Sequence, residues 1–306
     1  MKNTERIISD FNPDNLGGFF DAFILDRKIR GLSPGSIRFY NQKLTPFLEW
    51  CQSQGLESIT QLTPHHLRLF LLWLQERGNS AGGRHAFYRA LRAFLNFYED
   101  ETEPENWKNP IKQVSAPKVP DAPLKPVSLE AFAKLVRACD QSTFYGSRHR
   151  AMFLVLLDSG VRASELIGIV LGDVDLISGS IQIQKGKGGK VRTVLIGRKS
   201  KKAIRFWLRK RGKGPGPLFV KKDGYRLTYK GLRSILERRL KASGVSGVSL
   251  HDFRRAFCLS QLQAGTPETT IARLMGHSNT QLIGLYARQT TRHLIEVFHS
   301  VADSEL

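Results

Sequence analysis

The pair Gly276-His277 is followed, nine residues after the histidine, by Tyr286. A tyrosine hydroxyl has a pKa of about 10, so it is a poor nucleophile at neutral pH. It becomes effective when cations and a proton acceptor surround it. The chain upstream offers groups of both kinds, and these are Arg162, Lys187, His251 and Arg254. The chemistry predicted for this chain depends on whether these residues converge on one site.

The spacing around Arg162 favours a positioned guanidinium. The segment Ser159-Gly160-Val161-Arg162 follows an apolar run at 151–157, which is typical of a buried helix ended by a glycine. Glu165 lies three residues further on, close enough to orient the guanidinium. An Arg-x-x-Glu pair taken alone is most often a surface ion pair of little consequence.

Two further segments carry basic groups at useful spacings. The Gly-rich run 185–190 (KGKGGK) is predicted to join two strands, at 180–184 and 191–196, in a hairpin turn. In His251-Asp252-Phe253-Arg254, the i and i+3 spacing places the histidine and the second arginine on one face of a helix. Each signal taken alone fits an ordinary structural role.

Taken together and in this order, the segments resemble the tyrosine recombinases, also called phage-integrase-type site-specific recombinases. The resemblance covers most of 127–290 and rests on five motifs: the Ser/Thr-Gly-x-Arg-x-x-Glu-Leu box, a hairpin lysine, His-x-x-Arg, Leu-x-Gly-His, and a tyrosine nine residues after that histidine. It implies a catalytic set of Arg162, Lys187, His251, Arg254, His277 and Tyr286, with Glu165 as a supporting acid.

The resemblance also implies a reaction. Tyr286 would attack a DNA phosphodiester and form a 3′-phosphotyrosine, with the arginines on the non-bridging oxygens and Lys187 protonating the leaving 5′-oxygen. His251 would assist proton transfer, and His277 would hydrogen-bond an oxygen. No metal or ATP is expected, because arginines supply the charge and the covalent bond conserves the phosphodiester energy. Further DNA-binding residues are expected at Lys185, Lys190, Arg192 and Arg255.

The sequence departs from the family pattern in small ways. Ser159 stands where threonine is commoner, and Arg255 stands where the family often has histidine. The turn offers three lysines, of which Lys187 aligns best, although Lys185 or Lys190 could be the general acid instead.

The charge distribution points to a polyanionic partner. The net charge is +20. Residues 1–114 hold 14 Lys and Arg against 13 Asp and Glu, whereas 115–306 hold 33 against 14. The stretch 185–241 alone has 21 basic residues and two acids. A field this strong attracts double-stranded DNA. The basic residues are spread over strand, turn and helix patterns, which disfavours a membrane surface.

The expected fold is mainly α with two domains. A bundle of about four helices is predicted over 1–114, from helical periodicity and from helix starts at Ser33-Pro34, Thr63-Pro64 and Ser80. This bundle resembles the SAM-like core-binding domain of the family. A Pro-rich linker is expected at 115–126. Residues 127–306 should form a mostly helical catalytic domain with a small antiparallel β-sheet, the DNA breaking-rejoining fold. Its later helices are expected at 229–242, 251–264, 267–275, 279–286 and 290–301.

The sequence also bears on cellular location and assembly. Cys51, Cys139 and Cys258 lack paired spacing and indicate reduced core thiols. With no apolar run long enough to span a membrane and no signal peptide pattern, the protein is expected in the cytoplasm, associated with the nucleoid. The apolar positions of 290–301 suggest that this segment docks in trans, linking subunits into a tetrameric synapse on DNA. The absence of an arm-binding domain before residue 15 disfavours an arm-type integrase.

Three alternatives remain open at this point. The same residues would serve a type IB topoisomerase-like nicking-closing enzyme, which relaxes supercoils without a second site. A non-catalytic DNA-binding protein could retain the fold. A metal-dependent transposase could use Asp173 and Asp175, although no third acid stands at a persuasive spacing. The favoured hypothesis is a recombinase that integrates, excises or resolves a DNA element, such as a mobile element.

Overall fold

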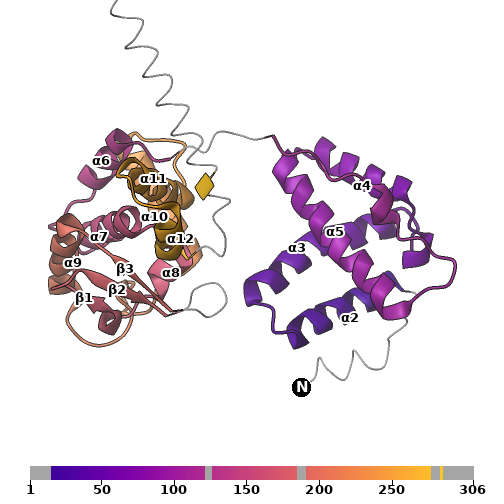
Figure 1. The fold of residues 1–306 in the computed structure, drawn as a ribbon, viewed down its shortest axis with the longest axis horizontal. Coiled ribbons are helices and arrows are strands. Elements are labelled where there is room, and N and C mark those ends of the chain that lie inside the picture. The colour runs from indigo at the N-terminus through magenta and orange to yellow at the C-terminus, as the bar shows by residue number, and fades with distance from the viewer. Residues whose placement is uncertain (1–14, 121–125, 185–190, 277–282, 285–306) are drawn as a thin grey trace, which may run out of the picture. The chain divides into compact units, whose positions relative to one another are not determined.

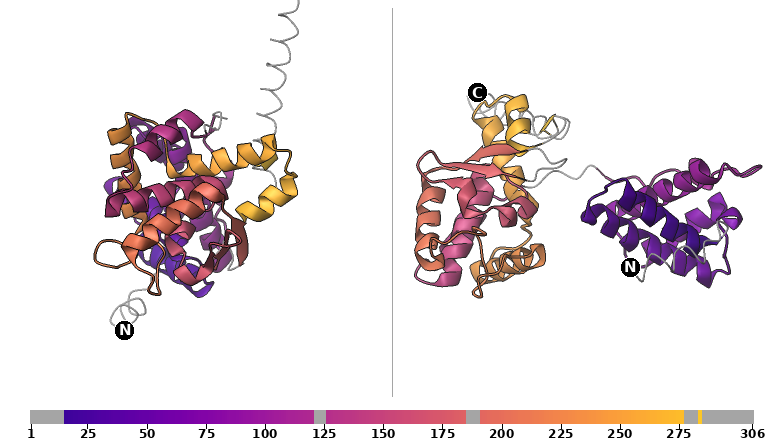
Figure 2. Two further views of the ribbon diagram at one scale, coloured as in Figure 1. Left: turned by 90° about the vertical axis from the view of Figure 1, so that its left-hand side faces the viewer. Right: turned by 90° about the horizontal axis from the view of Figure 1, so that it is seen from below.

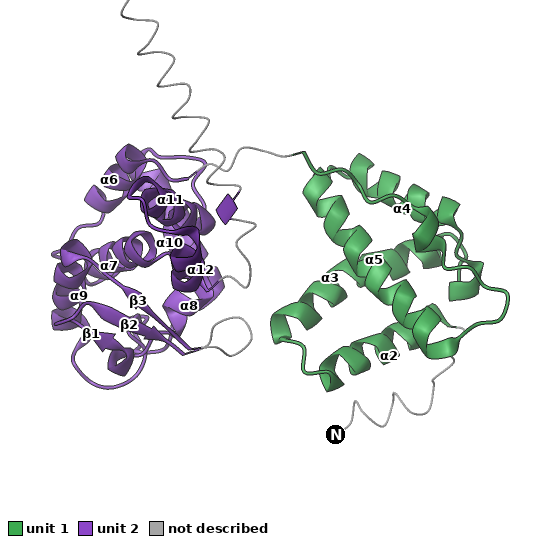
Figure 3. Ribbon diagram, in the orientation of Figure 1, with its two compact units in different colours: residues 1–122 green, residues 123–306 purple. Residues whose placement is uncertain are grey.

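The chain, seen in a computed structural model, forms two compact units, residues 1–122 and 123–306 (Figures 1 and 3). The structure describes residues 15–120, 126–184, 191–276 and 283–284. Each unit has its own buried core.

The first unit is a helical bundle, as predicted. Its helices are α2 (Leu16–Ile29), α3 (Pro34–Ser53), α4 (Pro64–Glu76) and α5 (Ala81–Thr102), with short 3₁₀ turns η1 (Ile59–Gln61) and η2 (Pro110–Gln113). The predicted caps are present: the side chains of Ser33, Thr63 and Ser80 each accept a backbone N–H of the first turn. Pro46 lies inside α3 without ending it.

An aromatic core holds this bundle together. Its largest fully buried side chains are Phe19, Phe23, Phe47, Phe70 and Phe94. The chain after α5 stays attached to the bundle, because the Tyr88 hydroxyl donates to the Val114 carbonyl at 2.9 Å and His85 Nδ1 lies 3.0 Å from the Pro117 carbonyl. The start of the segment expected as a linker, 115–126, is thus bonded to the first unit.

The second unit is built around α7 (Phe144–Ser159), which is buried along most of its length, as its apolar run predicts. The other helices are α6 (Leu129–Arg137), α8 (Ala163–Gly168), α9 (Arg198–Arg211), α10 (Tyr229–Ser243), α11 (Leu250–Gln263) and α12 (Glu268–Met275). Helices α9 and α11 pack against α7 (Figures 1 and 2). The expected helices at 279–286 and 290–301 lie almost wholly outside the described residues.

A small antiparallel sheet completes the second unit. Strands β1 (Val174–Asp175), β2 (Ser180–Ile183) and β3 (Arg192–Leu195) pair in the order β1-β2-β3, with Ser180 opposite Leu195 and Ile183 opposite Arg192. The two predicted strands are confirmed, and β1, preceded by the 3₁₀ turn η3 (Leu171–Asp173), was not expected. The turn at 185–190 lies outside the described residues.

Helix α9 was not predicted from the sequence because its basic residues obscure a narrow apolar face. That face buries Ala203, Ile204 and Trp207, and the Trp207 indole donates to the Leu218 carbonyl at 2.8 Å. The basic side chains therefore cover a helix whose other side belongs to the core.

The three cysteines are buried free thiols, as predicted for Cys51, Cys139 and Cys258. No helix in the described part of the chain is both long enough and apolar enough to cross a membrane.

Candidate active site

Arg162 is positioned by the junction between α7 and α8. Gly160 ends α7 in the left-handed region, with φ of +58°, and Arg162 is the N-cap residue of α8. A Cβ at residue 160 would overlap with the ring of Phe257 in α11. Glycine is required here both for the backbone conformation and for the close approach of α11.

Glu165 is the buried anion of the site. Its Oε2 accepts the backbone N–H of Arg162 at 2.7 Å, and its Oε1 accepts from the Arg162 guanidinium at 2.9 Å. Arg192 adds two parallel bonds, Nη1 to Oε1 at 2.9 Å and Nη2 to Oε2 at 2.7 Å. Burial would raise the pKa of Glu165, but the bonds from Arg192 and Arg162 outweigh it and lower that pKa to about 2. The carboxylate is therefore ionised at neutral pH.

Arg192 joins three elements. It begins β3, pairs with Glu165 of α8, and donates from Nε to the Leu274 carbonyl of α12 at 2.9 Å. Its side chain is only 11% exposed. From the sequence, Arg192 was expected to bind DNA. In the structure its guanidinium bonds to Glu165 and to the Leu274 carbonyl, and the DNA-binding role stays a prediction.

Arg254 is buried in α11, with 2% of its surface exposed. Its Nη1 donates to the Gly160 carbonyl at 2.5 Å, and its Nη2 donates to the Met275 carbonyl at 2.6 Å. Arg254 therefore ties the end of α7 to the end of α12. These bonds place it in the same cluster as Arg162 and Glu165.

The C-terminus of α12 is the meeting point of this cluster. Its successive carbonyls at Leu274, Met275 and Gly276 accept from Arg192, Arg254 and Arg162, the last at 3.1 Å. Unpaired carbonyls and the helix dipole give a helix C-terminus a partial negative charge, which favours cations there. Gly276, with φ of +63°, has no Cβ, and one would lie 3.0 Å from the Arg192 guanidinium.

His251 lies in the first turn of α11 and is exposed. Partial desolvation lowers its pKa below 6.5, and the positive charges of Arg255, Arg254 and Arg162 lower it further, while Asp252 opposes them. The imidazole is therefore mainly neutral at pH 7 and can accept a proton.

Arg255 has a local contact. Its Nη1 donates to Asp252 Oδ1 at 2.8 Å, and the other Asp252 oxygen accepts the backbone N–H and hydroxyl of Ser249. These bonds fix the start of α11, which carries His251 and Arg254. The DNA-binding role assigned to Arg255 from sequence stays a prediction.

Five of the predicted residues lie outside the described part of the chain: Lys185, Lys187, Lys190, His277 and Tyr286. Their described neighbours are close to the cluster. Ile183 and Arg192, which flank the lysine turn, face each other across β2 and β3. Gly276, which precedes His277, accepts from Arg162.

The two acids that a metal-dependent transposase could use stabilise local turns. Asp173 accepts the backbone N–H of Val170 and the amide of Gln184, and Asp175 accepts the backbone N–H of Ile177 and the hydroxyl of Ser178. Both acids therefore have structural roles in local turns.

Two models of one known protein family match this chain. The model for the catalytic part of the phage integrase family matches residues 127–293, and the model for the phage integrase N-terminal SAM-like domain matches residues 19–109. The chain therefore belongs to the phage integrase family.

Individual relatives agree with this assignment. The chain is 28% identical over 281 residues to tyrosine recombinase XerC of Pseudomonas fluorescens, covering 90% of this chain and 92% of the relative. Its fold is similar to that of a lambda integrase tetramer bound to a Holliday junction, with TM-score 0.73, 16% identity, and coverage of 92% and 80%. It is also similar to XerH site-specific recombinase bound to difH substrate in a post-cleavage complex, with TM-score 0.70, 21% identity, and coverage of 89% and 81%.

Arg162, Glu165 and Arg254 were predicted from the sequence, as was the contact of Glu165 with the Arg162 guanidinium. The contacts made by Arg192 and those with the carbonyls of α12 were not predicted. The bonds from Arg192 to Glu165 and to Leu274 span 27 and 82 residues of sequence. The available signal was an arginine at the start of a strand beside the lysine turn. The sequence does not distinguish this arginine from the other basic residues of the stretch 185–241.

Proposed function

We propose that this chain is a site-specific DNA recombinase that cleaves and rejoins DNA strands through a 3′-phosphotyrosine at Tyr286. The observation that carries the proposal is the convergence of Arg162, Arg192 and Arg254 on the last carbonyls of α12, which directly precede His277 in the sequence. Relatives named tyrosine recombinase XerC, and family members seen bound to DNA, support the same conclusion.

The positive cluster suits a phosphodiester. Negative charge grows on the non-bridging oxygens as the nucleophile adds, and guanidinium groups stabilise it through charge-assisted hydrogen bonds. Arg162 is suited to contact these oxygens directly, since its side chain is 31% exposed while Glu165 and the Gly276 carbonyl hold it in place. Arg254 adds a buried positive charge to the same end of α12.

The proposed steps balance without a cofactor. The Tyr286 hydroxyl gives its proton to His251 as its oxygen bonds to phosphorus, the bond from phosphorus to the 5′-oxygen breaks, and Lys187 donates the proton that the leaving oxygen needs. His251 assists proton transfer, as its neutral state allows. Attack by a 5′-hydroxyl from a partner strand then reverses these changes. We include in the proposal that neither metal nor ATP is required, so activity should persist in EDTA.

Recovery of covalent protein–DNA adducts tests this function. The full chain is incubated with fragmented genomic DNA, denatured in detergent, and the adducts are isolated and sequenced at the cleavage point. Adducts should map to a short recurrent sequence and disappear with Tyr286→Phe, while duplex binding stays nearly unchanged. Adducts formed by the Phe variant would exclude Tyr286 as the nucleophile.

A second assay separates recombination from nicking and closing. A plasmid with two copies of the recovered site should be resolved into two circles by a recombinase. Relaxation of a supercoiled plasmid that lacks a partner site, without exchange, would instead favour the topoisomerase-like activity.

The proposal extends to assembly and location. Leu294, Ile295, Val297 and Phe298 are spaced for an apolar helical face, and we propose that 290–301 docks on a neighbouring subunit of a tetramer. Deleting 288–306 should impair synapsis more than DNA binding by the monomer. Unchanged synapsis would overturn the docking. A nucleoid-associated protein in the cytoplasm fits this activity.

A further inference from the structure

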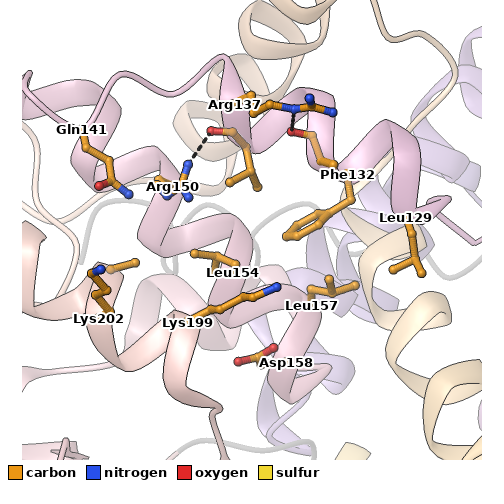
Figure 4. A pocket seen from close by; sticks show the side chains of 13 residues that line it. Leu129, Phe132, Arg137, Gln141, Arg150, Leu154, Leu157, Asp158, Lys199 and Lys202 are labelled. Carbon is orange, nitrogen blue, oxygen red and sulfur yellow. Dashed lines mark hydrogen bonds between the residues drawn. The ribbon is translucent and has the colours of Figure 1, made fainter.

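Two cavities in the described part of the second unit are lined partly by basic side chains. The first, of about 680 Å³, lies between α6, α7 and α9 (Figure 4). Its arginines have backbone partners: Arg150 donates to the Val136 carbonyl at 3.1 Å and Arg137 to the Ala133 carbonyl at 3.3 Å. Leu129, Phe132 and Leu154 give it apolar walls. Its arginines therefore give no indication of a missing anion.

The second cavity has a different chemical character. It measures about 510 Å³ and lies between the start of α7, the segment at 221–223 and α10. None of the residues in the arginine cluster around Glu165 lines it. Its function is therefore a separate question from strand cleavage.

A buried cation lines this cavity. Arg148 is 4% exposed, and its Nη1 donates to the Val220 carbonyl at 2.6 Å. Among the described residues, its Nε–H has no acceptor and no carboxylate forms an ion pair with it. Burial lowers the pKa of Arg148 to about 10, so it stays charged at pH 7. A buried charge without a counterion is costly.

The neighbouring histidine adds a second donor. Arg148 Nη2 lies 2.9 Å from His149 Nε2. A guanidinium only donates, so Nε2 must be the acceptor and the ring proton must sit on Nδ1. His149 is 4% exposed, and within the described part of the chain Nδ1 has no partner. Burial and then the charge of Arg148 lower the pKa of His149 to about 3, so the ring is neutral.

The remaining polar lining is almost entirely positive. Lys221, Lys222, Arg238 and Arg239 surround the cavity, and Arg239 Nε is a third buried donor without an acceptor among the described residues. Asp223, the one acid among the described residues of the lining, pairs with Lys221 at 3.1 Å. The cavity thus combines unpaired donors with an excess of positive charge.

We propose that this cavity binds the terminal phosphate of a small phosphate ester. Phosphate oxygens are strong acceptors and carry the negative charge that Arg148 lacks. Tyr145 is 48% exposed; the His149 ring lies 6.2 Å from its ring and the Arg148 guanidinium 5.2 Å from it, so the exposed part of the ring can contact a planar group such as a nucleobase. A nucleoside diphosphate combines both features.

The depth of the donors favours a small ligand over the DNA backbone. Arg148 and His149 are almost completely covered, so a phosphodiester inside a duplex would reach only the exposed Lys222 and Arg238. A terminal phosphate on a small molecule can enter the cavity end-on.

Binding of ADP to the full chain tests the proposal. The melting temperature and the dissociation constant are measured with ADP, pyrophosphate and adenosine, at ionic strength held constant with sodium chloride. ADP and pyrophosphate should raise the melting temperature saturably, ADP at the lower concentration, and adenosine should have little effect. The variant Lys222→Glu/Arg238→Glu changes only exposed side chains and should weaken ADP binding at least about tenfold.

Further variants and a competitor make the outcome decisive. Arg148→Met should also lose ADP binding, whereas Lys199→Glu/Lys202→Glu, which changes the first cavity, should retain it. Absence of saturable stabilisation, or equal ADP binding by the Lys222→Glu/Arg238→Glu variant, would overturn the proposal. Complete displacement of ADP by a saturating random duplex would show that the site serves DNA, which also overturns it. Adduct formation by Tyr286 is scored separately, so failure of either proposal is recognised independently.

Discussion

The guanidinium of Arg192 and the carboxylate of Glu165 face each other in a two-point contact, with parallel N–H···O distances of 2.9 and 2.7 Å. The same guanidinium holds the Leu274 carbonyl. Glu165 in turn holds Arg162. Arg192 is thus a positioning residue: it links β3 to α8 through Glu165 and to α12 through the Leu274 carbonyl.

Replacing Arg192 tests this positioning role. Arg192→Lys keeps the charge but loses the planar two-point contact, so the single-turnover cleavage rate should fall by about 10–100-fold while the dissociation constant for duplex DNA changes little. Arg198→Lys, at the exposed start of α9, is the matched control and should leave the rate unaltered. Weakened DNA binding with an unchanged rate would instead support the DNA-contact role assigned from sequence.

The buried Glu165 carboxylate makes stability sensitive to acid. Its pKa is about 2 in the folded chain and near 4.5 when unfolded, so it contributes stability above pH 4.5 that is lost as the pH falls toward 2. The contribution is on the order of 3 kcal/mol. Urea unfolding between pH 7 and pH 3 should show a smaller decline for Glu165→Gln, which starts less stable. Equal slopes for both proteins would refute the assignment.

Gly160 should be intolerant of any side chain. Its φ of +58° and the close approach of the Phe257 ring mean that Gly160→Ala adds backbone strain and a steric clash, together about 2–5 kcal/mol of lost unfolding free energy. Gly244→Ala is a clean control, because φ is +67° but nothing lies within 4 Å, so only about 1–2 kcal/mol should be lost. Adding Phe257→Leu to Gly160→Ala should restore part of the difference. Equal losses at the two glycines would exclude the clash.

The state of His251 predicts the pH profile of cleavage. Because the neutral imidazole accepts protons, the rate should fall as the ring becomes protonated, with a midpoint below pH 6.5. Arg255→Gln removes a neighbouring positive charge and should move the midpoint to higher pH. His251→Gln should abolish this fall in the cleavage rate at low pH. A midpoint above 6.5 in the unmodified protein would contradict the inferred shift.

The basic surface predicts a strong salt dependence of DNA binding. On α9 the exposed cations are Arg198, Lys199, Lys202, Arg205, Arg209 and Lys210. If the second unit makes six or more phosphate contacts, affinity for duplex DNA should fall about 10³-fold between 50 and 200 mM salt. Fluorescence anisotropy with a labelled duplex measures this slope. A flat response would show that the charge serves some purpose other than DNA binding.

Much of the fold was predictable because local patterns carry it. Ser33, Thr63 and Ser80 begin helices through their own side chains, and the apolar run at 151–157 can only be a buried element. Helix α9 and strand β1 were missed for physical reasons. Helix α9 presents a few apolar side chains among many cations, and β1 has two residues and exists only through pairing with β2.

The sequence by itself determined the chemical inventory of the protein: the order of its motifs, its charge, its cap residues and the candidates Arg162, Glu165, His251 and Arg254. The tertiary structure decided which of these groups meet. The contact of Arg192 with Glu165 and the arrival of arginines from three elements at the α12 carbonyls depend on how β3, α8, α11 and α12 pack. Residue spacing constrains contacts only within a turn or a hairpin. Contacts across many tens of residues are fixed by the shared core.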